Sequence, residues 1–136
     1  MLAFAANSLS NVVESGFLIN FLKEELITIL IALLAINTTT GSIVMTKLRD
    51  ISDSTGVSFS STIRELRLSI FEQLIFIIVG IVVLVCLDSK VVMELHSQLE
   101  NILNILLISV FIASLHNLYD TASSIFIILE HEESSD

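Results

Sequence analysis

Three long apolar segments constrain this chain more than any other feature of its sequence. Segments 25–47, 69–87 and 101–119 are each long enough to cross about 30 Å of hydrocarbon at about 1.5 Å of rise per residue. The 136-residue chain is 54% hydrophobic, has a mean hydropathy of +0.89 and is only 15% charged. A soluble domain of this size has too few polar residues to cover so much apolar surface. The sequence predicts an all-α integral membrane protein with three transmembrane helices.

The segments around these spans fit one membrane domain, residues 1–136. Residues 1–22 carry apolar side chains at steps of three and four opposite Asn7, Asn11 and Glu14. This pattern is typical of an amphipathic helix that lies on the membrane, and Glu14 makes a fourth span costly. We therefore expect an N-terminal amphipathic helix before the first span.

Two connections and a tail complete the predicted order. In connection 48–68 the turn-forming residues DSTGVS break the first helix, and a capping-box pattern from Thr62 to Glu65 predicts that the next helix starts there. Connection 88–100 begins with DSK, which marks the end of the second span. Segment 120–136 is expected to continue the third helix, to pack its IFIIL stretch beside Ile51, Phe59 and Ile63, and to end in an acidic tail.

The six basic residues are distributed unevenly. Lys47, Arg49, Arg64 and Arg67 fall around one connection, and this cluster is called the basic patch. Cytoplasmic loops carry an excess of Lys and Arg, so the patch and the C-terminus are expected on the cytoplasmic side of a multi-pass protein of the cell inner membrane. The patch is either a topology signal beside anionic lipid or a binding site for an anionic regulator.

A line of small and polar side chains follows one face of the first span. Every third or fourth residue belongs to this set, called the polar stripe: Glu25, Thr28, Ala32, Ala35, Thr39, Ser42 and Thr46. Arg49 and Asp53 continue it. Such a stripe is either a packing seam between helices or the lining of a water-filled path formed by several copies. In the second case Ala32 and Ala35 form the apolar constriction, and Glu25 and Arg49 form charged rings at its mouths.

Polar residues elsewhere in the spans have simpler expected roles. Asn37 lies off the polar stripe near mid-membrane, where an unpaired amide is expensive, so it is expected to bond to another helix. His116 and Asp120 are four residues apart in a series that also contains Ser109 and Ala113, and they are expected to form a polar pair. Glu72 and Gln73 are expected to reach the headgroups or to pair with arginines of the basic patch.

The sequence lacks the motifs of an enzyme or a metal protein. It has four glycines and no phosphate-cradling loop, no nucleophile elbow and no zinc motif, and His116 with Asp120 supplies too few ligands for a stable metal site. Cys86 is the single cysteine, so a disulfide within one chain is impossible. We expect no enzymatic activity, no cofactor and no metal; the expected partners are the lipid bilayer and further copies of the chain.

The three spans, the hydroxyl-bearing first helix, the basic inner loop and the acidic tail together resemble the small polytopic membrane proteins of bacterial anti-phage defence, such as the Hailong-type membrane effector and the Kiwa-type membrane component. The resemblance implies a homo-oligomer, a tetramer in our expectation. It also implies that a cytoplasmic protein or nucleotide-type ligand gates the oligomer, which permeabilises the membrane. Alternatives are a non-conducting membrane scaffold, sensor or immunity protein, or a holin-like phage protein, although holins usually end in a basic tail.

Overall fold

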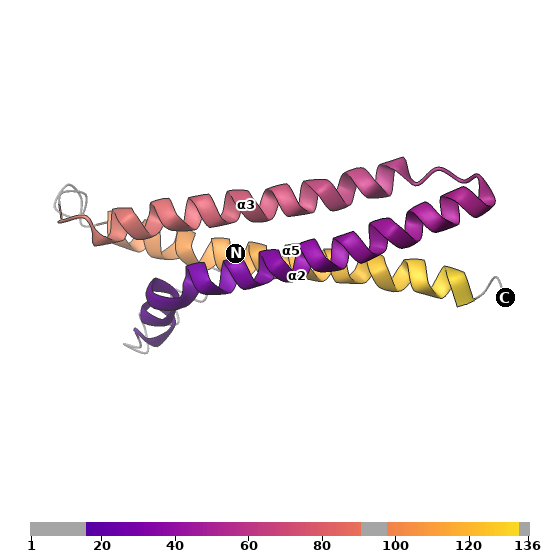
Figure 1. Cartoon of the computed structure of the whole chain (residues 1–136). Helices are drawn as coiled ribbons and strands as arrows, with labels where there is room; N and C mark the ends of the chain where they lie inside the picture. The colour runs from indigo at the N-terminus through magenta and orange to yellow at the C-terminus, as the bar shows by residue number, and fades with distance from the viewer. Residues whose placement is uncertain (1–15, 91–97, 134–136) are drawn as a thin grey trace.

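Three long α-helices, packed side by side, make up the computed structural model (Figure 1). They are α2 (Phe17–Thr55), α3 (Ser60–Asp88) and α5 (Leu99–Glu133), and each contacts the other two. The structure describes residues 16–90 and 98–133, with side chains described up to residue 123. No strand occurs in these ranges. All three helices are long and apolar enough to cross a membrane, as the sequence predicts for an all-α membrane protein.

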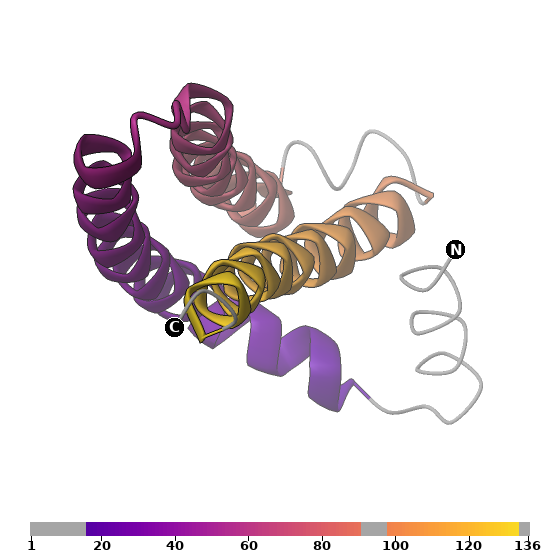
Figure 2. The ribbon, with the colours of Figure 1, turned by 90° about the vertical axis from the view of Figure 1, so that its right-hand side faces the viewer.

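The helices extend well beyond the predicted spans. At about 1.5 Å per residue, the 39 residues of α2 measure about 58 Å, nearly twice the thickness of the hydrocarbon. Residues 17–22, predicted to belong to a separate amphipathic helix, are the first turns of α2, because no proline or glycine interrupts the chain between Phe17 and Thr40. Figure 2 shows these turns bending across the bundle below α5. The remainder of the predicted amphipathic helix lies outside the described residues.

A tight turn joins α2 to α3. Gly56 adopts φ +72°, and its N–H donates to the carbonyl of Ser52 at 2.8 Å, which ends α2 within the predicted DSTGVS segment. The new helix starts at Ser60 behind the N-cap residue Phe59, so the predicted N-cap at Thr62 is wrong by three residues, and no side-chain hydrogen bond caps this end. The turn of residues 56–59 and the basic patch occupy the same end of the bundle, called the basic end.

The other predicted boundaries fall close to the observed ones. Helix α3 ends at Asp88, at the predicted DSK segment. Residues 91–97 of connection 88–100 lie outside the described residues, and α5 begins at Leu99. The predicted continuation of the third helix is confirmed, since α5 runs to Glu133. The side chains of its IFIIL stretch lie outside those described, as does the acidic tail beyond Glu133.

The interior of the bundle has three levels. At the end farther from the 56–59 turn, an apolar cluster contains Leu22, Leu26 and Leu30 of α2, Val83 of α3, and Leu107 and Ile108 of α5. At the basic end, Val44, Leu48 and Leu66 form a second apolar cluster. Between the two clusters the buried side chains are polar except for Leu33. These polar side chains and the partly buried Ser69 are called the polar layer: Asn37, Ser69, Gln73, Ser114, Asn117 and Thr121.

Candidate functional site

The polar stripe faces outward from the bundle. All seven of its side chains are exposed, and so are those of Arg49 and Asp53. The buried face of α2 lies almost opposite and consists of Ile19, Leu22, Leu26, Leu30, Leu33, Asn37, Gly41, Val44 and Leu48. The stripe is therefore not a seam within one chain. It contacts lipid, water or another molecule.

Two hydroxyls of the stripe bond to their own helix. Ser42 donates to the carbonyl of Thr38 at 2.8 Å, and Thr46 donates to the carbonyl of Ser42 at 3.0 Å. Each bond spans four residues, a geometry in which a hydroxyl is satisfied without a partner helix. These two side chains are thus compatible with lipid as well as with water.

Asn37 is placed on the buried face of α2, with 1% of its surface exposed, between the turns of Leu33 and Gly41. Neither its oxygen nor its nitrogen has a hydrogen-bond partner. The expected bond to another helix is therefore absent from this arrangement of the described residues.

Gln73 shares this environment. It was expected to reach the headgroups or an arginine, but the structure buries it completely between the helices, with both amide atoms unpartnered. The helix register explains its position: a side chain at Gly41 would contact Ile70, and one at Gly80 would contact Leu30. These two contacts show that α2 and α3 run in opposite directions. Asn37, four residues before Gly41, therefore lies at the same level as Gln73, three residues after Ile70.

Hydrogen bonds join α3 to α5 in the neighbouring turn of the polar layer. The amide nitrogen of Asn117 donates to the carbonyl of Ser69 at 2.9 Å, while the Ser69 hydroxyl donates to the Asn117 side-chain oxygen. The hydroxyls of Ser69 and Thr121 lie 2.9 Å apart. Ser114, completely buried one turn farther in, donates to the carbonyl of Val110 at 2.8 Å.

A pocket opens beside these bonds, between the first half of α3 and the second half of α5. Its volume is about 280 Å³, and Ser69, Asn117 and Thr121 form part of its wall. The carboxylates of Glu65, Glu72 and Asp120 stand around it, together with Thr62, Leu66 and Leu68. The pocket is thus an acidic opening that leads to the polar layer from the basic end.

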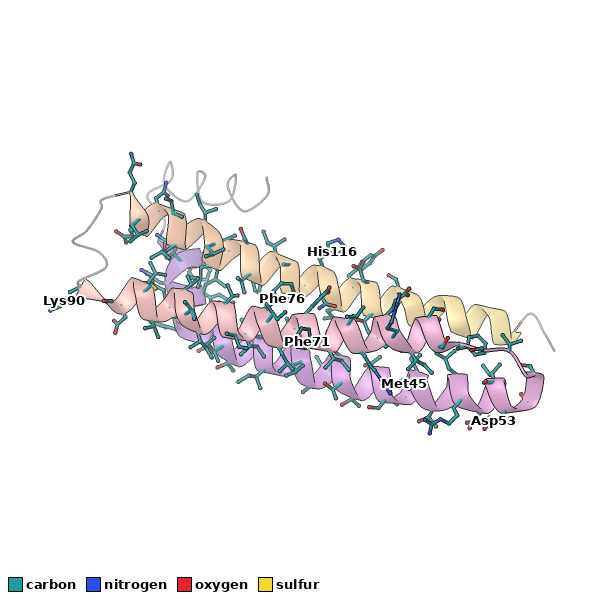
Figure 3. All side chains as sticks on the ribbon, turned by 90° about the horizontal axis from the view of Figure 1, so that it is seen from above. Met45, Asp53, Phe71, Phe76, Lys90 and His116 are labelled. Carbon is teal, nitrogen blue, oxygen red and sulfur yellow. The ribbon has the colours of Figure 1, made fainter. Side chains whose placement is uncertain are left out.

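His116 and Asp120 lie together on the outside of α5. His116 Nδ1 is 3.3 Å from Asp120 Oδ2, and the two side chains are 71% and 64% exposed. Figure 3 shows His116 pointing away from the other two helices. Such an exposed pair contributes little to stability. Within the part of the chain that the structure describes, no three His, Cys, Asp or Glu side chains come together as metal ligands.

The side chains of the basic patch are exposed and lie on both helices that meet at the 56–59 turn. Lys47 and Arg49 belong to α2, and Arg64 and Arg67 belong to α3. Figure 3 shows Asp53, near this turn, and Lys90 at opposite ends of the bundle. The patch therefore lies on two of the three helices at one end of the molecule.

On α5, sequence reasoning missed the members of the polar layer by one residue. It singled out Ala113, His116 and Asp120 on α5, whereas the buried series is Ser114, Asn117 and Thr121, each one position later. On α3 the signal was present as Ser69, Gln73 and Gly80, the small and polar residues of one face in the most apolar segment. Comparison of the chain with protein-family models, with curated proteins and with solved structures found no significant match.

Proposed function

We propose that copies of this chain associate in the bilayer into a channel whose path is lined by the polar stripe of α2. One observation carries the proposal: every stripe residue is exposed, although the opposite face of the same helix is packed against α3 and α5. A hydroxyl- and alanine-bearing face suits close approach of neighbouring helices or contact with water better than contact with lipid tails.

The spacing of residues on α2 supports an assembly of this kind. The stripe recurs every seven residues, as in Glu25, Ala32, Thr39 and Thr46, whereas the buried face recurs every eleven, as in Leu22, Leu33 and Val44. A seven-residue repeat favours helices that wind around one another with a left-handed supercoil, and an eleven-residue repeat does not. The stripe thus has the spacing expected for contacts with α2 helices of other copies, whereas the buried face has a different spacing and contacts the helices of its own chain.

Side-chain size and charge along the stripe suit an ion path. Ala32 and Ala35 are its smallest members, and they occupy the middle of the predicted span as an apolar constriction. Glu25 and Arg49 stand near the two ends of that span, so each would form a ring of like charges around the axis. We place the basic end and the C-terminus on the cytoplasmic side.

The second candidate function is a non-conducting membrane scaffold, sensor or immunity protein. It is favoured by the bonds of Ser42 and Thr46 to their own backbone, because hydroxyls satisfied in this way need neither water nor a partner. In that case the polar stripe is a helix seam between copies, and no ion path exists.

For the cellular role, we propose the setting that the resemblance implies: an anti-phage defence effector of the inner membrane that a cytoplasmic protein or anionic ligand holds inactive. The exposed basic patch supports this part of the proposal, since it offers a positive surface at the end assigned to the cytoplasm. The same surface serves anionic lipid equally well.

Membrane potential in vesicles that contain the purified chain tests the channel. We expect Ala35→Leu to abolish ion flux, because added bulk closes the constriction, and Thr39→Ser to retain flux, because the hydroxyl remains. Ile31→Phe is the control: Ile31 is exposed on α2 but lies to one side of the stripe, so added bulk there leaves the flux unchanged.

Assembly must be measured beside flux, because overpacking at a helix seam costs about 1–3 kcal/mol and acts through assembly. The channel requires Ala35→Leu protein that inserts and oligomerises but does not conduct. Wild-type protein that leaves the potential intact, with Ala35→Leu merely losing its oligomer, would identify the scaffold instead.

A further inference from the structure

Burial of the Asn37 and Gln73 amides is energetically unfavourable in a membrane-spanning bundle. Together they place two oxygens and two nitrogens in the interior without a single hydrogen bond. Leaving a buried polar group unsatisfied is costly, and lipid around the bundle supplies no donor or acceptor. Such groups normally indicate a small polar molecule that completes their hydrogen bonds.

Polar side chains connect these amides to the pocket between α3 and α5. Ser69, Asn117 and Thr121 line that pocket, and Gln73 lies one helical turn beyond Ser69 on the same buried face of α3. Ser114 stands one turn before Asn117 on α5, so the buried residues of both helices continue from the pocket toward the level of Asn37. By contrast, the apolar clusters on either side of the polar layer offer a polar molecule no partner.

We propose that the polar layer binds water, which enters each protomer from the pocket at the basic end and solvates Asn37 and Gln73 at mid-bundle. Water is the ligand that suits two primary amides and several hydroxyls, because it donates and accepts at the same site. The apolar cluster around Leu26, Leu30 and Val83 blocks the path beyond Asn37. The hydrated layer is thus closed at its far end, separate from the polar stripe and independent of the proposed channel.

Cysteine accessibility in the full-length protein tests the hydration. In a Cys86→Ala background, a small cationic methanethiosulfonate reagent is applied to membranes that contain Asn37→Cys or Leu33→Cys. Both positions are buried on the same face of α2, one turn apart, but Leu33 lies toward the apolar cluster. The reagent needs water and a thiolate, so we expect the thiol of the Asn37→Cys variant to react at least about ten-fold faster than that of the Leu33→Cys variant.

A second pair of variants keeps the test independent of one substitution. On α3, Gln73→Cys is compared with Val83→Cys, which is buried within the apolar cluster. The expected order is the same, with the thiol of the Gln73→Cys variant the faster to react. Circular dichroism of each variant checks that the helices have formed, and equal slow reaction of the polar and apolar positions in folded protein would overturn the proposal.

The route of entry has its own test. Thr121→Leu adds bulk at the wall of the pocket, so it should slow modification of the Asn37→Cys variant without slowing that of a Ser58→Cys variant, whose thiol is exposed in the turn outside the spans. A cationic reagent is chosen because Glu65, Glu72 and Asp120 surround the opening. Reaction of the Asn37→Cys thiol that is fast and unaffected by Thr121→Leu would show that water arrives by another path, and the proposed pocket entrance would be wrong.

Discussion

Asn117 joins α3 and α5 through both ends of its amide. Its nitrogen donates to the Ser69 carbonyl at 2.9 Å and its oxygen accepts from the Ser69 hydroxyl, while its own backbone carbonyl accepts from Thr121 at 3.0 Å. A buried amide that pairs its donor and its acceptor with one residue specifies both the register and the rotation of the two helices. Asn37, equally buried, lacks such a partner, which is why we assign water to it.

Removing this amide tests its contribution at the scale of a single residue. We expect Asn117→Ala to lower the free energy of unfolding in detergent by about 1–2 kcal/mol, since hydrogen bonds between membrane helices are individually modest and the Ser69 groups lose their partners. His116→Ala is the matched control one position earlier. Its side chain is 71% exposed, so stability should hardly change. Equal effects of the two substitutions would contradict the assigned role.

At the scale of elements, the α2–α3 connection depends on a left-handed residue. Gly56 has φ +72°, and a Cβ added there would meet nothing within 4 Å, so the requirement for glycine is conformational and not steric. The bond from its N–H supplies one carbonyl of the last turn of α2, that of Ser52, with a partner. The two helices therefore reverse direction within residues 56–59.

Two substitutions at Gly56 are expected to lower stability to different extents. Gly56→Ala should destabilise the hairpin by about 1 kcal/mol, because a Cβ disfavours the left-handed region, whereas Gly56→Asn should cost less, because asparagine tolerates that region. Thermal unfolding of the two variants in the same detergent measures the difference. An alanine variant as stable as the wild type would mean that the turn adopts another conformation in solution.

At the scale of the whole molecule, the chain has more apolar and small-residue surface than its own packing covers. Between 17% and 28% of the residues in the most apolar windows of the three helices are buried, so most of each helix faces outward. Lipid suits the outward isoleucines and valines of α3, but the polar stripe of α2 differs from them in size and chemistry. We propose that the polar stripe differs from these lipid-facing side chains because copies of the chain associate through α2.

Neighbouring threonines on α2 allow this association to be tested with matched variants. Thr38 and Thr39 are both exposed, but successive residues of an α-helix point about 100° apart, so only Thr39 belongs to the stripe. In the Cys86→Ala background, oxidation in membranes should cross-link Thr39→Cys protein into dimers and leave Thr38→Cys protein monomeric. A bifunctional cross-linker should then give a ladder that ends at one size, four copies in our expectation. Monomers of both variants would exclude the assembly.

The membrane class, the number of spanning helices and most of their ends could be predicted from the sequence alone. Apolar length and scarce charge require lipid as the solvent, and Gly56 and Asp88 lie where the turn signals predicted breaks. These properties depend on neighbouring residues and on hydrogen bonds within one helix, which are the same whatever the helix contacts. Periodicity likewise predicted that Asn37 faces away from the polar stripe.

Which polar residues are buried together could not be predicted from the sequence, because it depends on how the three helices pack. Rotation of α5 by one residue exchanges Ser114, Asn117 and Thr121 for Ala113, His116 and Asp120, and a nearly uniform apolar helix carries no local signal for that choice. Gln73 is next to Glu72, and its burial follows from the contacts of Gly41 and Gly80 across the α2–α3 interface. Rotation and register depend on how three surfaces fit, because side-chain volumes from different helices must interlock at close packing. That fit, and with it the polar layer, is a property of the assembled bundle.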